Sequence, residues 1–265
     1  MKVNNWHYDI KDICEYPVGI KMDGESILSN AVNAANYDLL MSINEDSKIL
    51  EIGCGANSYL LSNIKNKDNW DAIDVYEADA RGRKCIATKL GSVHDIPFSN
   101  ESFDFVLANQ SIEHWHEYGV SLGDGVNEIL RVLKVGGTAH INFPFFLHGH
   151  PWFVKGDMTS ILNLFEPAVC KIDSITAYQD SVEPDYIGWR RCKFPDFYVK
   201  KLHTPDSSFV VELAITKMRS SSSDKKIADI KFQPLKRQSS FRRNIIHGLD
   251  VLAWKVMTKL TSFLK

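Results

Sequence analysis

The stretch that decides the fold is Ile49-Leu50-Glu51-Ile52-Gly53-Cys54-Gly55. A short apolar run that ends in a glycine-rich turn, just before a helix-like segment, is typical of the first strand–turn–helix unit of a doubly wound α/β domain. Gly53 and Gly55 let the backbone approach a ligand closely and adopt turn conformations that a side chain resists. A Gly-x-Gly turn can also be only a tight connection between a strand and a helix, so its meaning depends on the residues downstream.

The next informative residue is Asp74, which lies 19 residues beyond Gly55 at the end of a second apolar run. In a doubly wound fold that separation places a carboxylate beside a ribose. A dinucleotide fingerprint would usually have a third glycine near position 58, but this chain has Ser58, and Glu51 would repel a pyrophosphate. A ligand with a cationic end and no phosphate fits better, as in S-adenosylmethionine.

Four further motifs follow in order, at Ser92–Phe98, Ser102–Val106, Ile112–His114 and Glu128–Gly137. Together with the glycine turn they closely resemble the class I S-adenosylmethionine-dependent methyltransferases, in particular the "type 11" group, over roughly residues 45–145. The resemblance implies a Rossmann-like, doubly wound, mostly parallel seven-stranded sheet with an antiparallel last strand. The chain departs from the pattern at Ser92, where an acidic residue often contacts the adenine, and at Val135, where a proline usually precedes the paired glycines.

The resemblance also implies which residues hold the cofactor, S-adenosyl-L-methionine. Glu51, Gly53 and Gly55 are expected at its methionine end, and Asp74 at the ribose. Ser92, Val93 and Asp95 are expected at the adenine. Asn109, after the fourth predicted strand, is expected to close the pocket.

Histidines gather after the fourth and fifth predicted strands, with His114 and His116 in the first place and His148 and His150 in the second. In a doubly wound fold both places lie at the carboxyl edge of the sheet, where ligands bind. Methylation of a hydroxyl requires removal of a proton, and an imidazole has a pKa suited to this. The candidate catalytic residues are therefore His114, His148 and His150, with a structural residue hydrogen-bonded below the site as the alternative role for His114. No metal ligands are expected, because no Asp/Glu triad spacing stands out.

Strand and helix patterns alternate along the first part of the chain. Strands are expected at 48–52, 71–75, 86–90, 103–108 and 138–144, with a helix at 124–134 and a packing or cofactor-covering helix at 23–43. Two later strands are expected at 169–176 and 209–218, separated by an insertion at about 178–208. Together with the resemblance, this pattern predicts a methyltransferase domain at 1–219, a serine-rich linker at 220–235 and a basic amphipathic helix at 236–265.

Composition agrees with a globular enzyme. The 265 residues are 44% hydrophobic and 24% charged, which is enough for one α/β core with an elaboration. The five cysteines are scattered without a CxxC pair, which favours a reducing compartment and argues against a disulfide framework or a zinc site. No apolar run reaches the length of a membrane span and no signal-peptide core is evident, so a cytoplasmic location is expected, either free or peripheral on the inner membrane face.

The acceptor is predicted from a second resemblance. The segment Asn142–Pro167 resembles methyltransferases of surface-polysaccharide and glycan assembly, which have a proline and a histidine after the fifth strand and an aromatic-rich segment beyond. Aromatic faces suit sugar rings, and the basic cluster Arg190, Arg191 and Lys193 would suit a phosphate or carboxylate, or would simply be a solvated loop. We expect O-methylation of a sugar or phosphorylated small molecule in cell-surface glycan biosynthesis.

Other functions remain open at this point. The acceptor could be another small metabolite, methylated on oxygen or nitrogen, or the chain could be a non-catalytic scaffold with a methyltransferase fold. A nucleic-acid acceptor is not expected, because the body of the chain is acidic and has no base-flipping motif of the Asn/Asp-Pro-Pro-Tyr type.

The C-terminal segment is basic and amphipathic. Residues 231–265 hold eight Lys or Arg and one acidic residue, Asp250, and apolar residues recur every three or four positions from Phe241 to Phe263. Such a helix can lie on an anionic membrane face, or it can pack on its own domain or on a second subunit as a homodimer contact.

Deletion of residues 224–265 tests the membrane alternative. The truncated protein is expected to bind S-adenosylhomocysteine as the full chain does but to lose association with anionic vesicles, because the predicted cationic helix is gone. Vesicle flotation and calorimetry measure the two properties. Unchanged flotation of the truncated protein would exclude the membrane contact.

Overall fold

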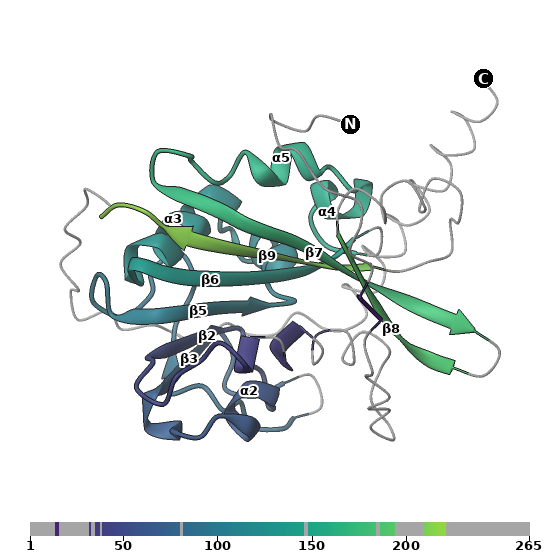
Figure 1. The fold of residues 1–265 in the computed structure, drawn as a ribbon. Coiled ribbons are helices and arrows are strands. Elements are labelled where there is room, and N and C mark those ends of the chain that lie inside the picture. The colour runs from purple at the N-terminus through teal and green to yellow at the C-terminus, as the bar shows by residue number, and fades with distance from the viewer. Residues whose placement is uncertain are drawn as a thin grey trace. The chain divides into compact units, whose positions relative to one another are not determined.

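The computed structural model describes residues 14–15, 32, 35–37, 39–79, 82–145, 148–183, 186–193 and 209–220 (Figure 1). The chain divides into two compact units, Met1–Pro234 and Leu235–Lys265, and all described residues belong to the first. The predicted helix at 236–265 and nearly all of the predicted linker lie outside the described residues. Most of the predicted helix at 23–43 does too, although residues 35–37 and 39–40 are helical.

The elements alternate along the chain as the sequence predicts. In order they are β1 (Cys14–Glu15), β2 (Ile49–Ile52), α2 (Tyr59–Asn63), the 3-10 helix η1 (Lys67–Asn69), β3 (Trp70–Asp74), β4 (Lys89–Leu90), β5 (Phe103–Asn109), the 3-10 helix η2 (Ile112–Tyr118), α3 (Leu122–Val132), β6 (Leu133–Phe145), α4 (Pro151–Lys155), α5 (Met158–Leu162), β7 (Cys170–Glu183), β8 (Tyr186–Lys193) and β9 (Phe209–Lys217).

One sheet contains all the described strands, in the order β1-β8-β7-β9-β6-β5-β2-β3-β4 (Figure 1). Strands β4, β3, β2, β5 and β6 are parallel, whereas β9 runs antiparallel to both β6 and β7. The seven strands from β4 to β7 therefore form a Rossmann-like, mostly parallel sheet in which only β9 is reversed. The predicted fold class is confirmed.

The two faces of the sheet carry different cores. Along β2 and β5, alternate side chains face opposite ways, as strand geometry requires. Leu50 and Val106 join the core beneath η2, α3, α4 and α5, whereas Ile49 and Leu107 join the core that contains Leu60 of α2. Figure 1 shows these helices on the two sides of the strands. Helices on both faces leave the strand ends as the place where loops from both sides meet.

The insertion expected at about 178–208 is partly a β-hairpin. Strand β7 continues to Glu183 and pairs with β8, with Tyr178 opposite Arg191 and Glu183 opposite Tyr186. Strand β1 then pairs with β8 at the edge of the sheet, where the sequence shows no clear period. Residues 178–183 and 186–193 of the insertion are therefore strand, because pairing with β8 extends β7 beyond the apolar pattern of its sequence. Residues 194–208 lie outside the described part.

Two further boundaries differ from the sequence expectation. Strand β6 begins at Leu133, directly after α3, and not at residue 138, because Leu133 already pairs with Phe103 of β5. Strand β4 is limited to Lys89–Leu90 within the expected range 86–90, since only these two residues pair with β3.

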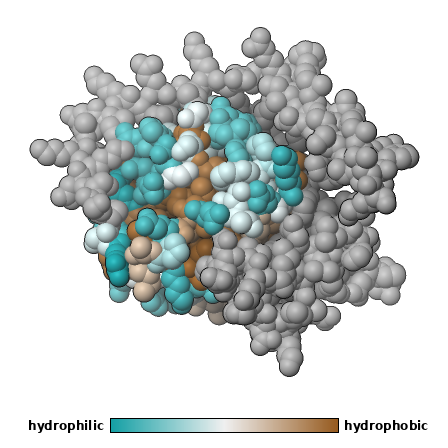
Figure 2. Space-filling view, turned by 90° about the horizontal axis from the view of Figure 1, so that it is seen from above, coloured by the Kyte–Doolittle hydropathy of each residue, from teal (hydrophilic) through white to brown (hydrophobic). Residues whose placement is uncertain are grey.

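Few large hydrophobic side chains are exposed in the described part of the chain. No helix among the described residues is both long enough and apolar enough to cross a bilayer. On the face seen from above, hydrophobic residues lie between hydrophilic ones (Figure 2). The exposed large hydrophobic side chains of the described part come from three segments, which contain Tyr37 and Met41, Val135, and Met218.

A buried ion pair fixes the loop that follows β4. Arg131 on α3 is 2% exposed and contacts both carboxylate oxygens of Glu128 at 2.9 Å. The same guanidinium donates to the carbonyl oxygens of Ile96 and Phe98, while Glu128 accepts from the Ile96 N–H at 3.0 Å. The loop expected at the adenine is therefore attached to α3 through charged hydrogen bonds.

The substitution Glu128→Gln is expected to lower the free energy of unfolding by ~3 kcal/mol or more, because it leaves a buried guanidinium without its counter-charge. Lys134→Gln is the matched control, since the Lys134–Asp104 pair is 40% and 34% exposed and is expected to contribute less than about 1 kcal/mol. Urea denaturation measures both. Equal losses for the two variants would contradict the structural role of the buried pair.

Candidate functional site

The glycine turn after β2 adopts the backbone conformation for which glycine is suited. Gly53 has φ +73° and Gly55 has φ +60°, both in the left-handed region. The Gly53 N–H donates to the carbonyl of Ile73 at 2.8 Å, and the Gly55 N–H donates to Asp74 Oδ2 at 2.9 Å. A Cβ on Gly53 would lie 3.0 Å from that of Ser111. The turn is thus held against the end of β3, and there is little room for a side chain at position 53.

Glu51 lies beneath this turn and is 4% exposed. Its Oε2 accepts from Ser58 Oγ at 2.6 Å and from Trp70 Nε1 at 3.2 Å, whereas Oε1 has a longer contact of 3.5 Å with Asn109 Nδ2. Burial raises the pKa of this carboxyl, and these hydrogen bonds act to lower it. If Glu51 contacts the methionine end of the cofactor as predicted, Oε1 is the oxygen available for it, because its one contact is long.

Asp74 lies at the carboxyl end of β3 and is 8% exposed. Besides Oδ2, which binds the turn, its Oδ1 accepts from the Tyr76 N–H at 3.0 Å. Each carboxylate oxygen can accept more than one hydrogen bond, so the group keeps acceptor capacity for hydroxyls. The ribose contact stays a prediction, and the structure adds a second task for Asp74 in shaping the turn.

The predicted adenine loop is a tight turn. The Asp95 N–H donates to the Ser92 carbonyl at 3.0 Å, and Ser92 Oγ accepts from the His94 N–H at 3.3 Å. The Val93 side chain is only 5% exposed and packs in the core. The predicted contact of Val93 with the adenine is therefore limited to the small part of this residue that is exposed.

Asn109 belongs to an amide network that joins three strand ends. Its Nδ2 faces Glu51 on β2, and its Oδ1 accepts from Asn142 Nδ2 on β6. Asn142 Oδ1 in turn accepts from both the backbone N–H and Nε2 of Gln110 at 3.1 Å. Asn109 thus connects the strand ends beside the turn, and its predicted closure of a pocket is not tested by this contact.

Polar atoms without partners lie immediately beyond β5. Within the described part of the chain, the buried side-chain atoms that have no hydrogen-bond partner are Gln110 Oε1, Ser111 Oγ and both carboxylate oxygens of Glu113. Gln110 also has φ +48°, an uncommon conformation for a residue with a side chain. Buried polar atoms are nearly always hydrogen-bonded, so their concentration in one short segment indicates a functional region.

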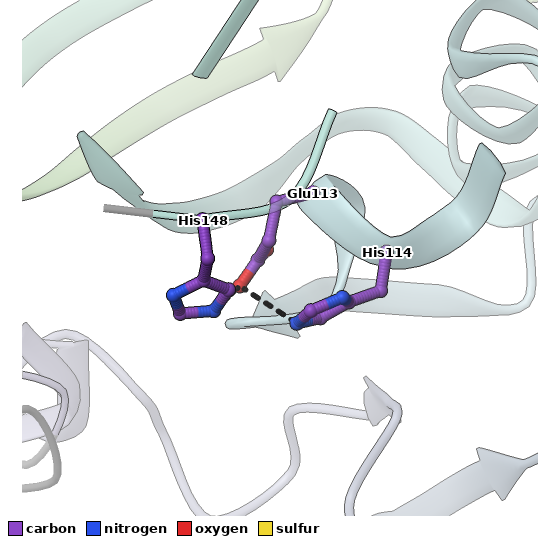
Figure 3. Close-up of side chains that lie close together, drawn as sticks. All are labelled: Glu113, His114 and His148. Atoms are coloured by element: carbon purple, nitrogen blue, oxygen red, sulfur yellow. Dashed lines mark ion pairs between the residues drawn. The ribbon is translucent and has the colours of Figure 1, made fainter. Parts of the chain in front are cut away.

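The histidines that follow β5 and β6 meet in space. The His114 and His148 rings stack with their centroids 5.1 Å apart, and His116 lies edge-on to His150 at 5.2 Å. Glu113 is fully buried between the first two, and its Oε1 is 3.8 Å from Nε2 of each (Figure 3). The structure therefore brings His114 and His148 together around the Glu113 carboxylate, whereas the third predicted base, His150, pairs with His116.

Gly149 makes the close approach of the two loops possible. The His150 N–H donates to the Glu113 carbonyl at 2.8 Å, which brings the loop before α4 against the start of η2. Gly149 has φ +94°, and a Cβ there would lie 2.6 Å from Glu113 Cβ. Only a glycine fits between His148 and His150 at this separation.

Hydrogen bonds give the histidines different states. His114 Nδ1 is 2.6 Å from Glu117 Oε1, so Nδ1 carries a proton and the neutral ring presents the Nε2 lone pair. His150 Nδ1 accepts from the Trp152 N–H at 3.3 Å and caps α4, which leaves the proton on Nε2. Burial lowers the pKa of His150, and His116 lowers it further. His114 is therefore better placed than His150 to accept a proton.

Burial also raises the pKa of the Glu113 carboxyl to about 7, although nearby His114 acts to lower it. The sequence predicts no metal ligands, yet the ligand atoms of Glu113, His114 and His148 all lie within 4.8 Å of one another. Sequence reasoning missed this cluster because its members come from two separate loops. It also missed Asn142, although a polar residue within the apolar run of β6 was a readable signal.

Comparison with known proteins agrees with this geometry. Residues 50–141 match the family described as a methyltransferase domain. The match begins at the β2–turn unit and ends in β6, so it covers the glycine turn, Asp74 and the Glu113–His114 pair. It supports a methyltransferase domain in this part of the chain.

Two relatives share parts of the sequence. One is an uncharacterized Escherichia coli protein, YafE, which is 38% identical over 74 residues, or 28% of this chain and 33% of the relative. The other is a rice protein, 2-methyl-6-phytyl-1,4-hydroquinone methyltransferase 1, chloroplastic, which is 24% identical over 58% of this chain and 43% of its own length. The chain thus spans less than half the length of these curated relatives.

Solved structures resemble the chain more broadly at lower identity. The MccD protein is 12% identical and has a TM-score of 0.48, covering 69% of this chain and 96% of its own. A possible histamine N-methyltransferase from Thermotoga maritima is 13% identical with a TM-score of 0.43, covering 71% of this chain and 91% of its own. The fold assignment rests on the strand order and directions described above.

The substitution Gly149→Ala tests the close contact between the two histidine loops. Both Gly149 and Gly136 have positive φ, so alanine at either position adds about 1–2 kcal/mol of backbone strain, but only at Gly149 does the new Cβ meet another residue. Gly149→Ala is expected to destabilise the protein more than Gly136→Ala and to shift the ring resonances of His114 and His148. Urea denaturation and histidine NMR spectra measure these effects. Unshifted resonances in Gly149→Ala would contradict the tight docking.

Proposed function

We propose that the chain transfers a methyl group from S-adenosylmethionine to a hydroxyl group of a small molecule. The observation that carries the proposal is the coincidence of two features at one sheet edge. The segment that matches the methyltransferase domain supplies the Gly53–Gly55 turn with Glu51 and Asp74, and the histidine cluster follows the neighbouring strands.

The residues around the turn fit this cofactor. Glu51 and Asp74 are carboxylates with acceptor capacity left, and they suit an amino group and ribose hydroxyls better than a phosphate. The Gly53–Gly55 backbone allows close approach, and Ser92, Val93 and Asp95 form the adjacent loop. The bound cofactor would supply an activated methyl group, and the protein has to orient the acceptor and remove its proton.

The histidine cluster fits the second of these tasks. His114 is oriented by Glu117 and presents Nε2 toward the cluster, which is the arrangement of a general base held by a carboxylate. His148 lies against its ring and could act in the same way. His150 is the least suitable of the three predicted bases, because its Nδ1 caps α4. We propose that it positions the loop before α4.

The acceptor is proposed to be a sugar or a phosphorylated small molecule of cell-surface glycan biosynthesis. Support comes from the aromatic segment that begins at Pro151, where the Trp152 ring lies edge-on to His150 at 5.1 Å. The basic residues Arg190, Arg191 and Lys193 lie on β8, and their side chains are outside the described part. The name of the rice relative, a hydroquinone methyltransferase, favours the alternative of another small hydroxyl-bearing metabolite.

The proposed enzyme is a cytoplasmic protein that does not act on nucleic acid and that makes a membrane or homodimer contact through the C-terminal helix. A non-catalytic scaffold is the competing proposal from a different class. It gives no reason for two partly buried histidines arranged around a buried carboxylate.

Calorimetric titration with S-adenosylhomocysteine, with NADH as a control ligand, tests the cofactor. Binding of the first alone is expected. Asp74→Ala is expected to weaken it by ~1–3 kcal/mol, the cost of lost hydrogen bonds to a charged group. Asp71→Asn, on the same strand but bonded to Thr88 Oγ1, is the control that should bind as the native protein does.

A second ligand separates the two tasks of Asp74. An S-adenosylhomocysteine analogue without ribose hydroxyls should bind the native protein and Asp74→Ala almost equally if Asp74 contacts the ribose. If Asp74→Ala weakened the binding of both ligands equally, the substitution would act by disturbing the glycine turn. No binding of S-adenosylhomocysteine by the native protein would favour the scaffold.

A further inference from the structure

The starting observation is a carboxylate that the protein buries without hydrogen-bonding it. Glu113 is 0% exposed, and neither Oε1 nor Oε2 has a hydrogen-bond partner in the described part of the chain. Burying such a group is costly unless a proton, a charged partner or a metal ion compensates. Glu51 shows the contrast, because its buried carboxylate accepts from Ser58, Trp70 and Asn109.

Two imidazole nitrogens face the same carboxylate oxygen. Nε2 of His114 and Nε2 of His148 each lie 3.8 Å from Glu113 Oε1, too far for direct hydrogen bonds (Figure 3). An ion with bonds of about 2.1 Å needs ligand atoms about 3.0–3.4 Å apart. Movements well below 1 Å would therefore bring each nitrogen to ligand spacing from the oxygen, and the three ligand atoms all lie within 4.8 Å of one another.

The surrounding contacts hold the ligands in a binding orientation. Glu117 Oε1 lies 2.6 Å from His114 Nδ1, which fixes the ring and directs its Nε2 lone pair to Glu113. A carboxylate behind a histidine in this way is a common outer contact of metal ligands. His148 is fixed from the other side, because Gly149 and the His150 N–H attach its loop to the backbone of Glu113.

We propose that Glu113, His114 and His148 bind one divalent first-row transition-metal ion, of the zinc, cobalt or manganese type. Two imidazoles and one carboxylate are a donor set suited to these ions, and three protein ligands leave a position for an oxygen of a second molecule. With the ion bound, both Nε2 atoms are ligands, and the cluster would activate an acceptor hydroxyl as a Lewis acid in place of a histidine base. That last role rests on the proposed methyl transfer, whereas metal binding does not.

The test is a metal titration of the full chain without a histidine tag, after chelator treatment and in the absence of cofactor. Co²⁺ is followed by its visible absorption and Zn²⁺ by calorimetry. One ion per chain is expected for the native protein. His148→Ala, His114→Ala and Glu113→Gln are each expected to weaken binding at least 10–100-fold.

His116→Ala is the matched control, because His116 lies on the same turn as His114 but faces His150. It is expected to bind the metal as the native protein does. Thermal unfolding provides a second readout that detects misfolded variants, since Zn²⁺ should raise the Tm of the native protein and of His116→Ala but not of His148→Ala. The proposal fails if the native protein binds no ion, if His148→Ala binds as tightly as native, or if His116→Ala loses binding.

The two proposals fail separately. Stoichiometric metal binding without affinity for S-adenosylhomocysteine would leave the metal site intact and remove the methyltransferase. Binding of S-adenosylhomocysteine without metal binding would do the reverse, and His114 would then be the base.

Discussion

The register of the parallel strands is the constraint on which the rest of the structure depends. Ile52 of β2 is opposite Ile73 on one side and Ala108 on the other, and Asn109 of β5 is opposite Asn142 of β6. The glycine turn, Asp74 and the amide network therefore begin at the same level of the sheet. Slipping one strand by a single residue would reverse its side chains and separate Glu51 from Asn109. Every distance in the candidate site is a consequence of this alignment.

The sequence predicts this edge well because its signals are local. The apolar run into Gly53 and Gly55, and a carboxylate at the end of the next run, identify the fold and the position of Asp74 without tertiary information. The β7–β8 hairpin could not be predicted in the same way, since β7 continues past its apolar pattern only because Tyr178 and later residues find partners on β8. The sequence could not predict that the Glu113 carboxylate lacks hydrogen-bond partners, because its surroundings include the loop that follows β6, a different strand.

The buried carboxylates at this edge differ in their hydrogen bonding. Glu51 and Asp74 are each satisfied by two or three donors from the protein, which holds their positions before any ligand arrives. Glu113 has no such donors, and its neighbours are imidazole nitrogens at 3.8 Å. The first arrangement is rigid and ready for a ligand of fixed shape. The second leaves a free-energy cost that only a proton or cation can offset.

This difference indicates that the loops after β2 and β3 and the loops after β5 and β6 have different functions. Beside β2 and β3, folding alone fixes the left-handed glycine turn and the hydrogen bonds of Glu51 and Asp74. After β5 and β6, in contrast, Gln110, Ser111 and Glu113 keep buried polar atoms without partners. These unpaired atoms lower the stability of the fold. The close approach of Gly149 to Glu113 nevertheless keeps the two histidine loops together. A site that is held together yet left unsatisfied is one that a bound species completes, so reaction chemistry is better sought around Glu113 than around the glycine turn.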